Sequence, residues 1–184
     1  MAGVGGQGIG LLSQALLRGI DHAGITAIAV DTHGLAQRGG SVVSRIRCGE
    51  QVHSPLIMAG AADLVLGMEI HEAMRGLESA LKREGVLVFL NVSFQPLPVR
   101  LGESAEILPG DILKAAKEKD ADVIQIDIEA MPSSRMQNMA LLGAVAKREL
   151  VPGVSAGHYE KALADLLPPP VLASNLPVFR SYAS

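Results

Sequence analysis

The stretch GVGGQGIGLLSQALLRGIDHAGITAIAVD, residues 3–31, decides the fold of this 184-residue chain. It opens with the G-x-G-x-x-G pattern, in which glycines permit a tight turn and close packing of the following helix on a sheet. Apolar residues from 7 to 23 then recur at helical spacing, and Gly24 ends the helix. Residues 26–31 predict a short buried strand. The segment therefore indicates a turn, a helix and a strand of an α/β domain.

The strand that should lead into this turn is the unusual part of the pattern. Met1 and Ala2 alone precede Gly3 in this sequence, whereas a strand needs roughly five residues. We therefore expect the first strand of the sheet to be absent or vestigial. The strands at 26–31 and 63–67 are then expected to lie next to the glycine turn, with a gap or a substitute segment between them.

Strands and helices alternate along the rest of the chain. Residues 41–48 alternate arginine with apolar side chains, which suits a strand with one polar face. Later strands are expected at 63–67, 85–90 and 123–126, and helices at 70–81, 111–119, 136–146 and 155–167. This order predicts a single α/β domain over 1–184, Rossmann-like and doubly wound, with a mostly parallel sheet. Prolines 168–170 stop the last helix, and the apolar tail 171–184 is expected to pack on the body or on a partner.

Composition excludes several classes of function. The net charge of −3, with 16 basic and 19 acidic residues interspersed, gives no reason to expect nucleic acid as a partner. No apolar stretch approaches the roughly 20 residues that span a bilayer, and no signal-peptide pattern is visible. The single cysteine, Cys48, excludes an internal disulfide and indicates a reducing cytoplasm. It also falls short of the roughly four thiolates or equivalent ligands that a self-contained iron–sulfur cluster or a cysteine-based zinc site needs.

A second glycine-rich loop, THGLAQRGGS at 32–41, carries a histidine and an arginine among its glycines. Together with GVGGQG at 3–8, SPLI at 54–57, ADLVLGMEIHEA at 62–73 and NMALLG at 138–143, it resembles the gamma subunits of the 2-oxoacid:ferredoxin oxidoreductases. The AQRGGSVVS form is similar to that of the indolepyruvate or arylpyruvate branch, in particular the small (beta) subunit of indolepyruvate:ferredoxin oxidoreductase. The resemblance covers nearly the whole chain in the same order.

The resemblance implies a reaction carried out by a complex rather than by this chain alone. Members convert a 2-oxoacid, coenzyme A and oxidised ferredoxin into acyl-CoA, carbon dioxide and reduced ferredoxin, using thiamine diphosphate with Mg²⁺ and iron–sulfur clusters. The chain has no Gly-Asp-Gly thiamine-diphosphate motif and no ferredoxin-type run of cysteines. We therefore expect those cofactors in partner subunits, with this chain as a non-catalytic, cytoplasmic subunit that holds no cofactor and reaches ferredoxin through the complex.

The candidate site residues lie in the two glycine-rich loops. The first group, expected to contact a cofactor of the complex, comprises Gly5, Gly6, Gln7 and Gly8. The second group, expected to face a partner subunit or the edge of the active site, comprises His33, Gln37, Arg38, Gly39 and Gly40. Arg38 offers a planar donor fork to a carboxylate or phosphate, and pairing with a neighbouring carboxylate is the alternative. No catalytic residue and no metal ligand is expected in the chain.

The competing hypothesis is a free-standing nucleotide-binding module with a regulatory or dehydrogenase function. In that reading Gly3, Gly5 and Gly8 approach a pyrophosphate and Asp31 binds a ribose hydroxyl. Asp31 as a plain residue at the end of a strand is the alternative. Affinity of the isolated chain for a nucleotide would favour this module over a subunit of a complex.

Two other chemically active side chains have ordinary interpretations. His71, between Glu69 and Glu72, lacks the H-E-x-x-H spacing of a metal site, and we interpret it as a solvated helix residue. Cys48 follows two arginines, which could lower the pKa of its thiol. A small buried hydrophobe is the commoner role of a lone strand cysteine.

Overall fold

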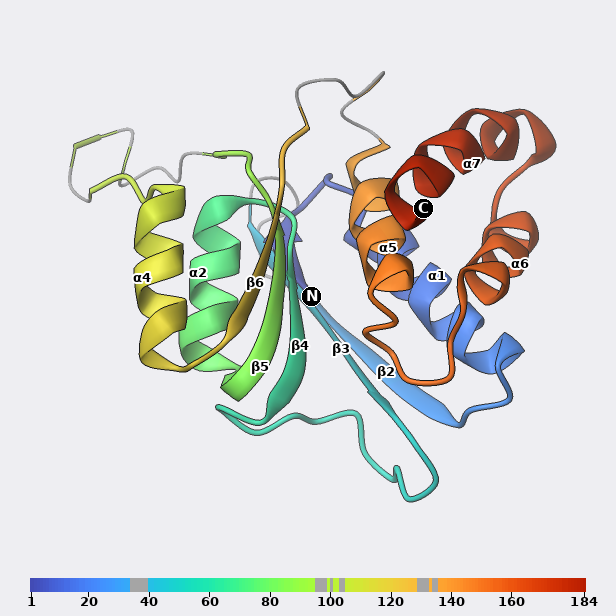
Figure 1. The fold of residues 1–184 in the computed structure, drawn as a ribbon, viewed down its shortest axis with the longest axis horizontal. Coiled ribbons are helices and arrows are strands. Elements are labelled where there is room, and N and C mark those ends of the chain that lie inside the picture. Colours follow the sequence, from blue (N-terminus) through green and yellow to red (C-terminus); the bar gives the residue numbers. More distant parts are fainter. Residues whose placement is uncertain (34–39, 95–98, 100, 103–104, 129–132, 134–135) are drawn as a thin grey trace.

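The computed structural model describes the chain except for residues 34–39, 95–98, 100, 103–104, 129–132 and 134–135. A central sheet is built from β1 (Ala2–Val4), β2 (Ala27–His33), β3 (Ser41–Cys48), β4 (Ala62–Gly67), β5 (Leu81–Leu90) and β6 (Asp122–Ile126). The described helices are α1 (Ile9–His22), α2 (Ile70–Ser79), α4 (Pro109–Glu118), α5 (Gln137–Lys147), α6 (Ala156–Leu166) and α7 (Pro169–Ala183). The sheet lies between two layers of helices (Figure 1), which confirms the predicted α/β class.

The sheet is mixed and mostly parallel, with the strand order β2-β3-β1-β4-β5-β6. Strands β1, β4, β5 and β6 pair in parallel, whereas β3 pairs antiparallel with β1 on one side and with β2 on the other. Strands β2 and β3 thus form an antiparallel hairpin attached to a parallel sheet, as mixed sheets commonly do at one edge.

The first strand is present but vestigial, since β1 has only 3 residues. It nevertheless lies inside the sheet, where Gly3 pairs with Val42 of β3 and Ala2 with Gly67 of β4. The expectation that β4 lies next to this strand is confirmed. The same expectation for β2 is wrong, because β2 pairs along its length with β3, and β3 takes the place beside β1.

Each face of the sheet packs against its own group of helices. Helices α1, α5, α6 and α7 cover one face, and α2 and α4 cover the other (Figure 1). The first core contains the inner residues of α1, such as Leu12 and Leu16, together with Tyr159 of α6 and Phe179 of α7. The second is built around residues such as Leu77 of α2. None of the described helices combines the length and apolarity needed to cross a membrane.

The C-terminal tail packs on the body as expected, and it does so as a helix that the sequence pattern did not predict. Pro169 occupies the first turn of α7, where a proline has no amide hydrogen to lose and a suitable φ. Helix α7 lies closely against α5 because Gly143 has no side chain: a Cβ there would lie 2.7 Å from the Phe179 carbonyl oxygen. The triple proline therefore ends α6 and begins α7.

Candidate functional site

The two glycine-rich loops meet at one edge of the sheet, which we call the carboxyl edge. Strands β1 and β4 end there at Val4 and Gly67, β2 ends there at His33, and β3 begins there at Ser41. The Gly5 amide donates a hydrogen bond to the Gly40 carbonyl (2.9 Å), which ties the two loops together. Open α/β sheets bind ligands at such edges.

The structure brings part of the predicted site together. Gly5, Gly6, Gln7 and Gly8 form the turn after β1, and His33 and Gly40 mark the two ends of the second loop at the same edge. The other three predicted residues of that loop, Gln37, Arg38 and Gly39, fall outside the residues that the structure describes. Their roles therefore remain predictions from the sequence.

The glycine turn is held in shape by Gln7. The Val4 amide donates to Gln7 Oε1 (2.7 Å), and Gln7 Nε2 donates to the Met68 carbonyl (3.4 Å). This side chain therefore clamps the turn to the residue that follows β4. Gly6 and Gly8 have φ angles of 102° and 83°, in the left-handed region that disfavours residues with a side chain.

The turn leads into an open helix N-terminus. Gly8 is the N-cap of α1, which has neither a side-chain cap nor an acidic residue in its first turn. The first amides of a helix have no partner within it and carry partial positive charge, so they attract anions. The Asn138 side chain lies against the turn, since a Cβ on Gly8 would lie 3.0 Å from Asn138 Nδ2. Asn138 Oδ1 is buried and has no hydrogen-bond partner within the described structure.

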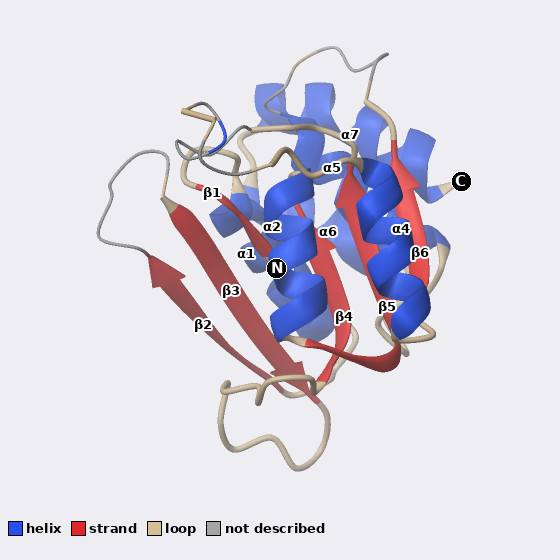
Figure 2. Cartoon of the chain, turned by 90° about the vertical axis from the view of Figure 1, so that its left-hand side faces the viewer, coloured by secondary structure: helices blue, strands red, loops and turns tan. Residues whose placement is uncertain are grey.

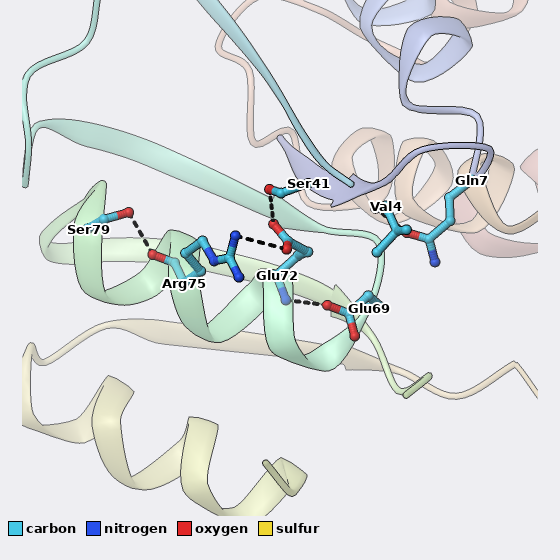
Figure 3. A network of polar contacts seen from close by, with 7 residues as sticks. All are labelled: Val4, Gln7, Ser41, Glu69, Glu72, Arg75 and Ser79. Atoms are coloured by element: carbon cyan, nitrogen blue, oxygen red, sulfur yellow. Dashed lines mark hydrogen bonds and ion pairs between the residues drawn. The ribbon is translucent and has the colours of Figure 1, made fainter. Parts of the chain in front are cut away.

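Two buried glutamates form a network beside the turn (Figure 3). Glu69, which is 0% exposed, caps α2 by accepting a hydrogen bond from the Glu72 amide, and it accepts a second from the Phe94 amide (3.3 Å). Glu72 accepts from the Ser41 hydroxyl (2.7 Å) and pairs with the Arg75 guanidinium (3.3 Å). The network joins the ends of β3, β4 and β5.

The interpretation of His71 as a solvated helix residue is wrong, because it is 6% exposed and its two acidic neighbours are also buried. His71 Nε2 has no hydrogen-bond partner among the residues described. The sequence did contain a signal for the glutamates. Glu69 and Glu72 have the spacing of an N-cap and the third helical residue, the spacing of a capping box.

A further carboxylate lies where β5 and β6 end. Asp127 accepts hydrogen bonds from Asn91 Nδ2 (2.7 Å) and Gln125 Nε2 (3.1 Å). Donation from Asn91 and then from Gln125 holds the pKa of Asp127 below its ordinary value, because both bonds favour the ionised carboxylate. This aspartate is therefore an exposed anion at the carboxyl edge.

The structure shows the surroundings of Asp31 and Cys48, the other two candidates from the sequence. Asp31 accepts from the Ser13 hydroxyl (3.4 Å) and also from Ser44, so it joins α1 to the hairpin. Cys48 is exposed rather than a buried hydrophobe. Partial burial, with a smaller effect of Asp63, raises the pKa of its thiol, so the lowering that the neighbouring arginines could cause is not observed.

The polar side chains of the described site are largely engaged with other parts of the chain. Its carboxylates are engaged in hydrogen bonds to backbone amides or side chains. Among the residues that the structure describes, no three His, Cys, Asp or Glu side chains lie where they could hold a metal ion. What the edge offers a ligand is backbone amides and the Asn138 side chain.

Comparison with known sequences gives a match along almost the whole chain. The family described as pyruvate ferredoxin/flavodoxin oxidoreductase matches residues 1–182. A curated relative from Methanothermobacter thermautotrophicus, named indolepyruvate oxidoreductase subunit IorB, is 34% identical over 186 residues. The alignment covers 98% of this chain and 92% of the relative.

Two solved structures share the fold. Pyruvate oxidoreductase subunit PORC from Thermotoga maritima superposes with a TM-score of 0.67 at 17% identity, covering 99% of this chain and 93% of that one. A 2-oxoglutarate:ferredoxin oxidoreductase from Magnetococcus marinus, solved with 2-oxoglutarate, coenzyme A and succinyl-CoA bound, gives a TM-score of 0.68 at 19% identity. This chain is covered to 99% there but spans only 30% of that longer chain.

Proposed function

The chain belongs to the pyruvate ferredoxin/flavodoxin oxidoreductase family, and we propose that it is a non-catalytic, gamma-type subunit of a cytoplasmic 2-oxoacid:ferredoxin oxidoreductase. The observation that carries this proposal is the 34% identity, over 98% of the chain, to a subunit of indolepyruvate oxidoreductase. That likeness favours indolepyruvate or another arylpyruvate as the 2-oxoacid. Structural neighbours that act on pyruvate and 2-oxoglutarate share the fold alone.

The chemistry of the complex requires groups that this chain cannot hold. Thiamine diphosphate with Mg²⁺ supplies the carbanion chemistry, and iron–sulfur clusters carry the electrons to ferredoxin. One cysteine cannot supply the thiolates of a cluster, and the sequence has no Gly-Asp-Gly motif for the diphosphate and its metal. The proposal therefore assigns these cofactors to partner subunits, with ferredoxin reached through the complex.

The carboxyl edge is the part of this chain that we expect to face the reaction. The open amides at the start of α1 and the Asn138 side chain fit an anionic group, such as a phosphate of coenzyme A. Gln7 acts by holding the turn in shape. The loop from His33 to Gly40 is expected to face the partner subunit, with Arg38 pairing with an anionic group there.

Reconstitution tests the proposal directly. The chain should form a stoichiometric complex with the thiamine-diphosphate-binding and iron–sulfur chains of the same organism. The complex should reduce ferredoxin or a viologen dye when a 2-oxoacid and coenzyme A are both present, and the isolated chain should not. Turnover by rigorously isolated chain with thiamine diphosphate and Mg²⁺ would refute the non-catalytic role. A partner preparation equally active without this chain would refute its role as a subunit.

Arg38 gives a residue-level test of the same proposal. Arg38→Ala should leave the stability of the chain within about 1 kcal/mol, as for an exposed ion pair, while lowering turnover of the complex. Arg38→Lys should restore only part of it, because an ammonium lacks the planar fork. Arg148→Ala, an exposed arginine just after α5, is the matched control. Lost thermal stability with complex activity intact would instead make Arg38 a structural residue.

The free-standing nucleotide-binding module is the second candidate, favoured by the left-handed glycine N-cap of α1. It is less well supported, because Asp31, the residue that would bind the ribose, already accepts hydrogen bonds from two serines. Calorimetry of the isolated chain with NAD and ATP distinguishes the two. Micromolar binding without any partner would favour the module.

A further inference from the structure

Among the residues that the structure describes, no helix lies on one face of the β2–β3 hairpin. Parallel α/β sheets normally have both faces covered, and here α1 covers one face of the hairpin. On the other face, α2 and α4 lie over β4, β5 and β6, and Figure 2 shows β2 and β3 extending beyond them. The hairpin therefore presents a bare sheet surface, the open face, on the side of α2.

Side-chain alternation shows which residues lie on the open face. Ser44 contacts Ser13 of α1 through its hydroxyl, so it points to the covered side, and its neighbours in the strand point the other way. Residues paired across the hairpin share a face, and Ile28 pairs with Arg47 and Val30 with Arg45. Ser41, which has the same parity as Arg45, bonds to Glu72 of α2 and confirms the assignment.

The apolar side chains of the open face belong to neither core. Ile28, Val30 and Val43 are half-buried and join neither the cluster under α1 nor the one under α2. By contrast, Ala27, Val42 and Ile46 on the covered side pack against the first core. These three side chains are thus apolar surface that the described part of the chain covers only in part.

The ionisable side chains that the hairpin places on the open face are both arginines. Arg45 donates to the Thr32 hydroxyl (3.4 Å) and Arg47 to the Ser54 carbonyl (3.3 Å). Within the described structure neither guanidinium forms an ion pair. Both retain donors that are free to meet a carboxylate, because a guanidinium has five N–H groups.

We propose that the open face of the β2–β3 hairpin docks an apolar surface edged with carboxylates on the thiamine-diphosphate-binding partner subunit. The inference rests on the proposed function, since it needs such a partner. Bidentate pairs with Arg45 and Arg47 would fix the register of the contact, and Ile28 and Val30 would supply apolar burial. Arginine beside aliphatic side chains is typical of protein interfaces.

Charge argues against a second copy of this chain as the occupant. A twofold interface places the same patch on both sides, so each copy would bring Arg45 and Arg47 against a patch in which Glu50 of the adjoining loop is the carboxylate, and positive charge would exceed negative charge. The neighbouring loop at 49–61 extends the same docking surface. It is tied to the face by Arg47 and Ser54, and it exposes Leu56 (68%) and Met58 (81%).

The test uses purified full-length chain and purified thiamine-diphosphate-binding subunit, with the Kd measured by biolayer interferometry. The double variant R45E/R47E should weaken binding by at least about tenfold, because like charges would replace the proposed pairs. Raising the salt from about 0.1 M to 0.5 M should shrink this difference by screening. R148E/K161E, the same charge change at exposed sites beyond α5 and on α6, is the matched control and should bind like the wild type.

Each result decides between the proposals. No complex with the wild-type chain would overturn the proposed function, and the docking inference with it. A complex that is indifferent to R45E/R47E, or equally weakened by R148E/K161E, would overturn the docking inference alone. A homodimer in sedimentation velocity that R45E/R47E abolishes would also overturn it. If R45E/R47E loses its native circular dichroism spectrum, R45Q/R47Q replaces it in the binding assay. R45Q/R47Q should bind the partner subunit more weakly than the wild type, and unchanged binding would refute docking through the open face.

Discussion

Tyr159→Phe should stabilise the protein, because it removes a buried hydroxyl that has no hydrogen-bond partner among the described residues. Tyr159 is 0% exposed, its ring lies against Gly19 and packs edge-on against Phe179, and its hydroxyl has no partner in the described part of the chain. A buried hydroxyl without a hydrogen bond costs about 1–3 kcal/mol, so its removal should raise the free energy of unfolding by about 1 kcal/mol at pH 7. The midpoint of thermal unfolding should rise by about 2–4 °C.

The gain should grow in alkali, and the sign follows from the pKa. Burial, with a smaller effect of Cys48, raises the pKa of Tyr159, so the unfolded phenol, with a pKa of about 10, ionises first. The contribution of this group to the free energy of unfolding is therefore fully present below about pH 10 and is lost as the pH rises toward the pKa of the folded state. At pH 11, ionisation of the Tyr159 phenol stabilises the unfolded state of the wild type by about 1.4 kcal/mol. The Phe variant has no phenol at this position, so its unfolded state is not stabilised in this way.

Urea denaturation followed by far-ultraviolet circular dichroism measures both effects, at pH 7 and at pH 11. Tyr182→Phe, at a half-buried position on α7, is the control for the loss of any tyrosine. A Tyr159→Phe variant that is less stable than wild type at pH 7 would show that the hydroxyl has a partner. A difference that does not widen between the two pH values would show that the buried phenol ionises as easily as the unfolded one.

Three more predictions concern the carboxyl edge and the hairpin. Glu69→Ala should lower the free energy of unfolding by about 2 kcal/mol in urea titrations, since it removes a helix cap and a second backbone bond, whereas Glu69→Asp should keep the cap and lose less. Gly8→Ala should cost about 1–2 kcal/mol, because of its positive φ and its contact with Asn138, whereas Gly10→Ala, in open space, should be neutral or stabilising. Cys48 should react with iodoacetamide more slowly at pH 8 than in the urea-unfolded chain, because its pKa is raised.

Each of these has a contradicting outcome. Equal losses for Glu69→Ala and Glu69→Asp would show that the cap contributes nothing. A Gly8→Ala variant as stable as Gly10→Ala would mean that the turn relaxes without cost. Faster alkylation of the folded chain would mean that the thiolate, rather than the thiol, is favoured at Cys48.

Much of the fold follows from local pattern. Strand β3 matches its predicted residues 41–48, and the alternation of Arg45 and Arg47 with apolar residues correctly indicates a polar face. The order of the strands in the sheet could not be predicted in the same way. Local pattern does not say whether two successive strands pair as an antiparallel hairpin or are linked by a crossover connection. The last helix was missed because prolines 168–170 end one helix and equally begin another.

The candidate site was predicted less completely, for a physical reason. Glycines that need special backbone angles are visible in a sequence, and Gly6 and Gly8 do adopt left-handed conformations. Burial of polar side chains depends on tertiary packing, so the spacing of Glu69 and Glu72 can indicate a helix cap but not that His71 between them is buried. The Asn138 amide reaches the turn from a helix far along the chain, and no local pattern encodes that contact.

Because β1 has only 3 residues, the sheet has few backbone hydrogen bonds where β1 joins β3 to β4. Three residue pairs join β1 to β3, but a single pair, Ala2 with Gly67, and the bond from the Met68 amide to the Ala2 carbonyl join it to β4. The antiparallel hairpin lies on one side of β1, and the parallel strands β4, β5 and β6 lie on the other. The glycine turn continues directly from β1, so it lies where the hairpin and the parallel strands share the fewest residue pairs.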